Sequence, residues 1–245
     1  MTVMGEGMRK IGLLGGMSWE STALYYRLLN EDVRERLGGF HSARLVLASV
    51  DFADIEAMQV AGDWDAAGAA LAEEARALEA AGAECLVLCT NTMHRVADAI
   101  EGAVGIPLLH LADVTAAAVR AAGVDRVALL GTRFTMEQPF YADRLRSHGL
   151  DVLVPEGDDL TLVHDVIYDE LVLGLVREES RAAYVDVVRR LVGRGAGGVV
   201  LGCTEIELLI GPDDVDVPVF ATTALHARAA VDFALEPTLG NNPGG

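Results

Sequence analysis

The chain has 245 residues, of which 51% are hydrophobic and 23% are charged, a composition typical of globular proteins that argues against a fibre or a disordered chain. Its formal net charge of -18, with no block of Lys and Arg, argues against nucleic acid and anionic membranes as partners. Since no apolar run approaches the roughly 18 residues of a membrane span, and the N-terminal residues lack the apolar centre of a signal peptide, we expect a cytoplasmic protein.

Short apolar runs alternate along the chain with longer, Ala-rich stretches of helical period. The apolar runs predict strands at residues 10–16, 44–50, 84–90, 126–132, 151–156 and 197–204. Residues 65–83 and 179–196 show the periodicity of amphipathic helices, and each stretch closes near a glycine. This alternation predicts repeated βαβ units, and therefore an α/β fold with mainly parallel sheets.

Two strand motifs occur twice. Residues 10–17, KIGLLGGM, resemble residues 126–133, RVALLGTR, and residues 81–91, AGAECLVLCTN, resemble residues 194–204, RGAGGVVLGCT. The two separations are nearly equal, so the chain is predicted to contain two similar α/β domains related by a pseudo-dyad. We expect residues 1–115 plus 216–245 to form the first domain and residues 116–215 the second, with the active site between them.

The duplicated strands end at Thr90 and at Cys203. Because ligands of such sheets bind at the carboxyl ends of the strands, near helix N-termini, the two side chains are predicted to oppose one another across a ligand. Inversion of a carbon stereocentre without a cofactor needs one group that removes a proton and another that delivers one to the opposite face. A thiol titrates near 8.5 and a helix N-terminus lowers that value, whereas a threonine hydroxyl is a much weaker acid.

Several motifs resemble the aspartate/glutamate racemase family, and the likeness extends over nearly the whole chain. They are IGLLGGMSWEST and YYRLLN near the start, CTNTMH at 89–94, LLGTRFTMEQPFY at 129–141 and GCTEIELL at 202–209. The resemblance implies two similar α/β domains, an amino-acid racemase that uses no cofactor and no pyridoxal phosphate, a small amino-acid substrate and a homodimer.

The resemblance also implies roles for individual residues. Cys203 matches the second catalytic cysteine, and Thr90 stands at the first catalytic position, where the usual family motif reads Cys-Asn-Thr. We therefore predict an asymmetric racemase in which Cys203 is the competent base. Substrate contacts are implied for Met17 and Ser18 in the first loop, Asn91 and Thr92 after Thr90, Thr132 and Thr135 in the loop opening the second half, and Thr204 and Glu205 beside Cys203.

The side chain of the substrate is harder to predict. Family members that act on acidic amino acids carry basic residues in two segments, which here are residues 49–56 and 158–171 and contain no Lys or Arg. His164 is the only candidate cation in them, and burying a carboxylate without a cation is costly. A neutral amino acid therefore has comparable weight to aspartate or glutamate.

Other interpretations remain open. Cys89 is expected to point away from Thr90, because side chains alternate along a strand, and to be a buried thiol behind the site; His94 is expected to cap or pack a helix. The three cysteines form no CxxC pair and the histidines show no ligand spacing, so neither a disulfide nor a metal site is predicted. A single competent thiol also suits a decarboxylase of small malonate-like acids, and an amino-acid-binding protein that lost turnover is a third alternative.

Overall fold

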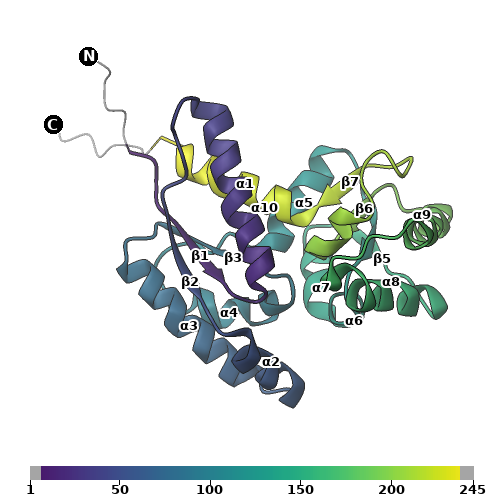
Figure 1. The fold of residues 1–245 in the computed structure, drawn as a ribbon, viewed down its shortest axis with the longest axis horizontal. Coiled ribbons are helices and arrows are strands. Elements are labelled where there is room, and N and C mark those ends of the chain that lie inside the picture. Colours follow the sequence, from purple (N-terminus) through teal and green to yellow (C-terminus); the bar gives the residue numbers. More distant parts are fainter. Residues whose placement is uncertain (1–6, 238–245) are drawn as a thin grey trace.

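The computed structural model describes residues 7–237, in which two parallel sheets are covered by helices (Figure 1). The strands are β1 (Ile11–Gly15), β2 (Leu45–Ser49), β3 (Cys85–Leu88), β4 (Arg126–Leu130), β5 (Asp151–Leu153), β6 (Val199–Leu201) and β7 (Val219–Ala221). The α-helices are α1 (Trp19–Leu37), α2 (Phe52–Ala61), α3 (Trp64–Ala80), α4 (Ala97–Glu101), α5 (Leu111–Ala121), α6 (Arg133–Glu137), α7 (Pro139–Ser147), α8 (Asp158–Asp169), α9 (Glu178–Gly193) and α10 (Thr222–Leu235). Short 3₁₀ turns are η1 (Thr92–Val96), η2 (Leu171–Leu173) and η3 (Thr204–Leu208).

The two sheets have the same strand order. The first runs β2-β1-β3 and the second β5-β4-β6-β7, and every pairing within them is parallel. In the second sheet, β7 is the outer neighbour of β6. The segment at Leu108 takes the corresponding place beside β3, through a parallel bridge between Leu86 and Leu108. The predicted α/β fold with two similar parallel halves is therefore confirmed, and the predicted strands and helices lie within a few residues of their observed bounds.

Helices cover both faces of each sheet. In β1, Ile11 and Leu13 pack with α1 and α10, whereas Leu14 packs with α3. In β4, Leu129 packs with α5 and α7, and Leu130 packs with α8 and α9. Because successive side chains of a strand point to opposite faces, nearly continuous apolar runs are what such doubly covered strands require. These layers leave the carboxyl ends of the strands as the open edges of the two halves.

The chain crosses between the halves at points other than those expected. Strand β7 pairs with β6 in the second sheet, although residues 216–245 were assigned to the first domain. Helix α5 packs on the second sheet, so a boundary at residue 115 would divide it. Helix α10 does belong with the first sheet, where it packs on α1 (Figure 1). The short β7 therefore ends the second half, and α10 returns the chain to the first.

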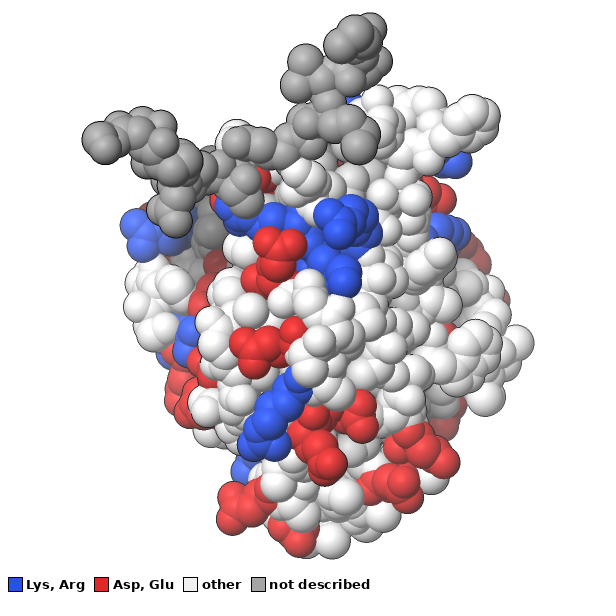
Figure 2. All heavy atoms as spheres, turned by 90° about the vertical axis from the view of Figure 1, so that its left-hand side faces the viewer, with Lys and Arg blue, Asp and Glu red and all other residues white. Residues whose placement is uncertain are grey.

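The surface carries its charge in small groups. On the face that holds α2 and α3, acidic side chains form several separate groups with Lys and Arg groups between them (Figure 2). In the second half of the molecule, exposed ion pairs such as Arg126 with Asp151 and Arg190 with Asp159 also bring opposite charges together. Within residues 7–237, no helix combines the length and apolar character needed to cross a membrane.

Candidate active site

A cavity of about 530 Å³ lies between the carboxyl edges of the two sheets. The predicted residues that line it from the first half are Met17, Ser18, Thr90, Asn91 and Thr92. Those that line it from the second half are Thr132, Thr135, Cys203, Thr204 and Glu205. The fold thus brings Thr90 and Cys203, which are 113 positions apart in the repeat, to one shared cavity.

The first loop is held by the start of α1. The Ser18 side chain caps this helix by accepting a hydrogen bond from the Ser21 N–H at 3.3 Å. The Thr22 hydroxyl donates to the Ser18 carbonyl at 2.8 Å and accepts from the Gly16 N–H at 2.9 Å. These contacts fix the loop that carries Met17 at the N-terminus of a long helix, where the helix dipole favours a negative ligand group.

Thr90 follows β3 in a turn whose backbone is fixed by His94. The Nδ1–H of His94 donates to the Thr90 carbonyl at 2.7 Å, because its Nε2 accepts from the Leu111 N–H at 3.2 Å. Burial lowers the pKa of His94 well below its ordinary value, so the ring is neutral at pH 7. His94 therefore packs and orients the turn, as expected, and its hydrogen bond is to the Thr90 backbone rather than to the hydroxyl.

Cys89, which directly follows β3, does not line the cavity. It is fully buried with Cys85 and Val87 in the cluster beneath α1 and α10, and burial raises the pKa of its thiol. The strand alternation predicted from the sequence is confirmed for this residue. Cys85 and Cys89 are buried and do not line the cavity, which leaves Cys203 as the thiol on the cavity.

Cys203 is partly exposed, and its thiol faces a carboxylate. Its Sγ–H donates to Glu205 Oε2 at 2.8 Å, and the Thr204 hydroxyl donates to the same oxygen at 3.0 Å. Burial, followed by the negative charge of Glu205, raises the pKa of Cys203 well above its ordinary value. The lowering expected from a helix N-terminus is outweighed, so Cys203 rests as a thiol whose proton already points at an acceptor.

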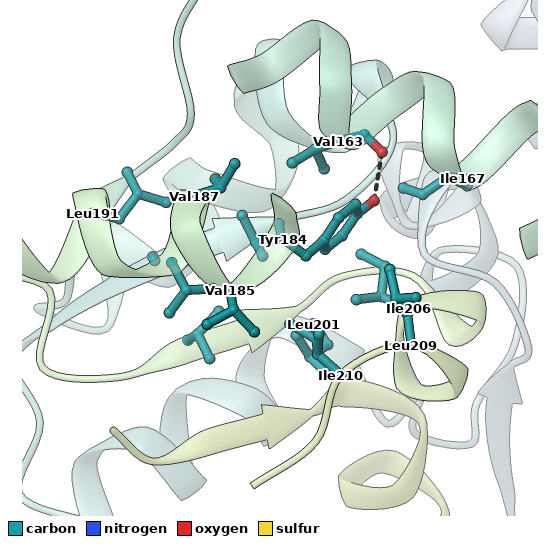
Figure 3. Packing of buried hydrophobic residues seen from close by; sticks show 14 of the residues in the cluster. Val163, Ile167, Tyr184, Val185, Val187, Leu191, Leu201, Ile206, Leu209 and Ile210 are labelled. Atoms are coloured by element: carbon teal, nitrogen blue, oxygen red, sulfur yellow. Dashed lines mark hydrogen bonds between the residues drawn. The ribbon is translucent and has the colours of Figure 1, made fainter. Parts of the chain in front are cut away.

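The turn that carries Cys203 is anchored in the second core. Ile206, Leu209 and Ile210 are at most 1% exposed, and they pack beside Tyr184 of α9 (Figure 3). The Tyr184 hydroxyl donates to the Val163 carbonyl of α8 at 2.6 Å. Close packing of this kind holds η3, and with it Cys203 and Glu205, in one geometry.

His164 is not among the residues that line the cavity. Its ring packs on Tyr168, with centroids 4.6 Å apart, and its Nδ1 accepts from the Arg133 N–H at 3.3 Å. Tyr168, which lies one helical turn further along α8, lines the cavity instead. The sequence placed His164 in the right segment, but the side chain that reaches the cavity is its neighbour on that helix.

One of the residues that line the cavity is an exposed cation that the sequence did not indicate. Arg27 of α1 lines the cavity, on the helix face that Glu20 and Leu24 share, since residues three to four positions apart lie on one face. The helical spacing of Glu20, Leu24 and Arg27 was the sequence feature that could have identified Arg27 as a cavity residue. Arg27 lies outside residues 49–56 and 158–171, the two segments in which His164 is the only candidate cation.

One buried acceptor on the cavity has no partner. Asn91 Oδ1 is inaccessible to solvent and accepts no hydrogen bond within the described part of the chain. A buried carbonyl oxygen without a donor is unfavourable, and nothing else in the described residues satisfies it. Across residues 7–237, no three His, Cys, Asp or Glu side chains are grouped as metal ligands would be.

Comparison with known proteins gives a consistent result. Residues 14–230 match the family described as Asp/Glu/Hydantoin racemase. The crystal structure of a Yersinia pestis protein described as a "putative Asp/Glu Racemase" is 53% identical, with a TM-score of 0.91, over 94% of this chain and 100% of the other.

Two further relatives are more distant. An aspartate racemase homologue from Pyrococcus horikoshii OT3 is 34% identical, with a TM-score of 0.86, over 93% of this chain and 99% of the other. The broad specificity amino-acid racemase RacX of Bacillus subtilis is 21% identical over 71% of this chain and 74% of its own length.

Proposed function

The chain belongs to the Asp/Glu/Hydantoin racemase family, and from this premise we propose that it interconverts L- and D-amino acids without pyridoxal phosphate. The observation that carries the proposal is the pair of corresponding turns, after β3 and β6, whose Thr90 and Cys203 line one cavity. A proton leaves Cα on one face and another arrives on the opposite face. The homodimer implied by the family resemblance and the cytoplasmic location expected from the sequence remain predictions.

Cys203 and Glu205 act as a pair on one face of the substrate. As the thiol proton moves to Glu205 Oε2, the thiolate removes the Cα proton, so that Cys203 becomes a thiol again and Glu205 holds the extra proton. The negative charge that develops on the substrate carboxylate is stabilised by N–H groups of the first loop at the start of α1. Asn91 and Thr92, which line the cavity beside Thr90, supply polar contacts to the substrate.

On the opposite face of the substrate, the group that delivers the proton is a weaker acid. A proton returns to Cα from the Thr90 hydroxyl, which takes one from water in the same step, and Glu205 releases its proton to solvent. Because a hydroxyl is a far weaker acid than a thiol, we expect slow or direction-biased turnover.

Thr90→Cys is expected to raise the rate about tenfold or more in at least one direction, because it supplies a stronger acid at the first catalytic position. The rates of both enantiomers are measured by chiral chromatography and compared with those of Thr92→Cys, which puts a thiol two residues away on the same cavity. A fall in both directions for Thr90→Cys would contradict the assigned role of Thr90.

The substrate that we propose is an acidic amino acid. Arg27 lines the cavity, and no ion pair or hydrogen bond holds its guanidinium within residues 7–237. A guanidinium that binds a carboxylate forms a charge-assisted hydrogen bond, which is stronger than a neutral one. This cation lowers the cost of burying a second carboxylate that the sequence alone made unfavourable.

Arg27→Met is expected to raise KM for aspartate or glutamate by up to about fivefold, because an ion pair formed by a solvent-exposed guanidinium contributes at most about 1 kcal/mol. KM values for neutral amino acids are expected to change little, since they form no such ion pair. Arg34→Met, at an exposed position of the same helix away from the cavity, is the matched control. An equal change of KM for acidic and neutral substrates would favour a neutral amino acid.

The single thiol on the cavity also favours a second candidate, a decarboxylase of small malonate-like acids, in which Cys203 protonates one face after loss of carbon dioxide. Incubation of each candidate substrate in D2O separates the two. Deuterium at Cα with inversion supports the racemase, and release of carbon dioxide supports the decarboxylase. Binding without either product supports an amino-acid-binding protein.

A further inference from the structure

A second carboxylic acid lies directly behind the cavity wall. Glu207 belongs to η3, four residues after Cys203, and its neighbours Glu205 and Leu208 line the cavity while Glu207 does not. Its Oε1 is inaccessible to solvent and has no hydrogen-bond partner within the described residues. A buried carboxyl oxygen without a donor is rare in native proteins and calls for a functional explanation.

The Glu207 carboxyl faces the first turn of α10. The backbone N–H and the hydroxyl of Thr223 are the groups there that stabilise its charge, and Thr223 itself lines the cavity. The Thr223 hydroxyl also stabilises the charged form of Tyr25, whose ring comes from α1 and lines the cavity too. Glu207 therefore joins the Cys203 turn of the second half to two helices of the first.

Within residues 7–237, no cation is among the groups that shift the pKa of Glu207. Tyr25 donates its hydroxyl proton to His226 Nδ1 at 2.9 Å, because His226 Nε2–H donates to the Leu109 carbonyl at 2.6 Å. Burial lowers the pKa of His226 to about 4, so this ring is neutral at pH 7. The titratable groups around Glu207 and the Cys203 turn are Cys203 at the start of η3, Glu205 on η3, Tyr25 on α1, His226 on α10, Tyr168 on α8, Glu170 directly after α8 and Tyr184 on α9.

Burial without a cation has a predictable electrostatic result. It raises the pKa of Glu207 to about 7, and the charge of Glu205 adds to this rise. When Glu207 is ionised, its negative charge in turn raises the pKa of Cys203. Cys203 caps the start of η3 and Glu207 lies within the same short turn, so the charge of one opposes the ionisation of the other.

We propose that Glu207 is a positioning residue that controls the ionisation of Cys203 from behind the cavity wall. It holds a proton at low pH and releases it near neutral pH, and each state changes how readily the Cys203 thiol gives up its own proton. The effect on the thiol does not depend on which reaction the cavity performs. Its consequence for turnover rests on the proposed function.

The test measures the rate at which iodoacetamide alkylates Cys203 between pH 5.5 and pH 9.5, since only the thiolate reacts. The wild-type curve is expected to contain an inflection near pH 7, where ionisation of Glu207 restrains the further rise of the rate. In Glu207→Gln this inflection disappears, and the rate at pH 8 rises about threefold or more, equivalent to about half a pKa unit. A curve that superimposes on that of the wild type would overturn the proposal.

Two controls identify the signal. Cys203→Ser is expected to abolish the labelling, because Cys85 and Cys89 are fully buried. Glu73→Gln, an exposed position on α3, removes the same charge far from the cavity and is expected to leave the curve unchanged. A shift of equal size in Glu73→Gln would mean that overall charge, rather than Glu207, sets the reactivity of the thiol.

A second variant decides the question if Glu207→Gln does not fold. Thr223→Val removes the hydroxyl that stabilises the ionised carboxylate, so the inflection is expected to move to higher pH, and an unmoved inflection would overturn the proposal. If no amino acid is turned over but the alkylation curves change as expected, the proposed function fails and the inference about Glu207 stands. If turnover occurs, kcat/KM of Glu207→Gln is expected to lose the same inflection while KM changes little.

Discussion

Replacing Cys203 by serine is expected to lower the rate of Cα–H exchange about a thousandfold, because a hydroxyl cannot replace a thiol as the base on its face of the substrate. Serine retains the shape of the side chain and can still donate to Glu205, so the fold and the substrate affinity should be preserved. The exchange rate is measured in D2O by the loss of the Cα–H signal in proton NMR, and affinity by calorimetry.

The control for this experiment is Cys89, a thiol in the first copy of the repeated motif. Cys89→Ala removes a fully buried thiol one residue from Thr90 and is expected to change the exchange rate by no more than about threefold, since the removed atom does not touch the cavity. If Cys203→Ser kept a rate within tenfold of the wild type while Cys89→Ala lost it, the assignment of the base would be reversed.

Gly16→Ala is expected to lower the free energy of unfolding by about 3 kcal/mol or more, through backbone strain and steric overlap together. Gly16 has φ 95°, a conformation that residues with a Cβ rarely adopt. An added Cβ would also overlap the carbonyl oxygen of Val50, which follows β2. Because Gly16 directly precedes Met17 and Ser18, we expect ligand binding to weaken as well.

Gly62→Ala separates the two causes. Gly62 ends α2 with φ 70°, and an added Cβ there would meet no atom within 4 Å. It therefore tests strain without overlap, and we expect a loss of about 1 kcal/mol. Urea unfolding at constant pH measures both variants. Equal losses at the two positions would show that the contact with Val50 relaxes, and that the first loop is less tightly held than its geometry indicates.

The elements that the sequence predicted well are those with strong local patterns. The strands beginning at Ile11, Cys85 and Arg126 are apolar runs bounded by turn residues, and the helix at Trp64–Ala80 has a clear apolar face. Strand β7 was missed because Val219–Ala221 is too short to show a period. Its assignment to a sheet depends on pairing with β6, a contact between distant parts of the chain that no local pattern reports.

For the candidate site, too, some residues were predicted from the sequence and others were not. Thr90 and Cys203 were identified because each follows a buried strand of a repeated motif, and the parallel sheets bring both turns to one cavity. His164 was the only candidate cation in its segment, but the geometry of α8 brings Tyr168 to the cavity instead. Arg27 was overlooked because it lies far along α1 from the first loop.

The amino-acid sequence by itself determined the duplicated α/β architecture and the position of one thiol and one hydroxyl at equivalent turns. These follow from patterns of neighbouring residues, which fix strands, helices and the turns between them. Only the tertiary structure decided which charges meet: the Cys203 thiol against Glu205, Arg27 on the cavity, and Glu207 buried behind it. The physical reason is that desolvation and Coulomb interaction depend on distances and on the exclusion of water, which arise when separate segments of the chain pack together.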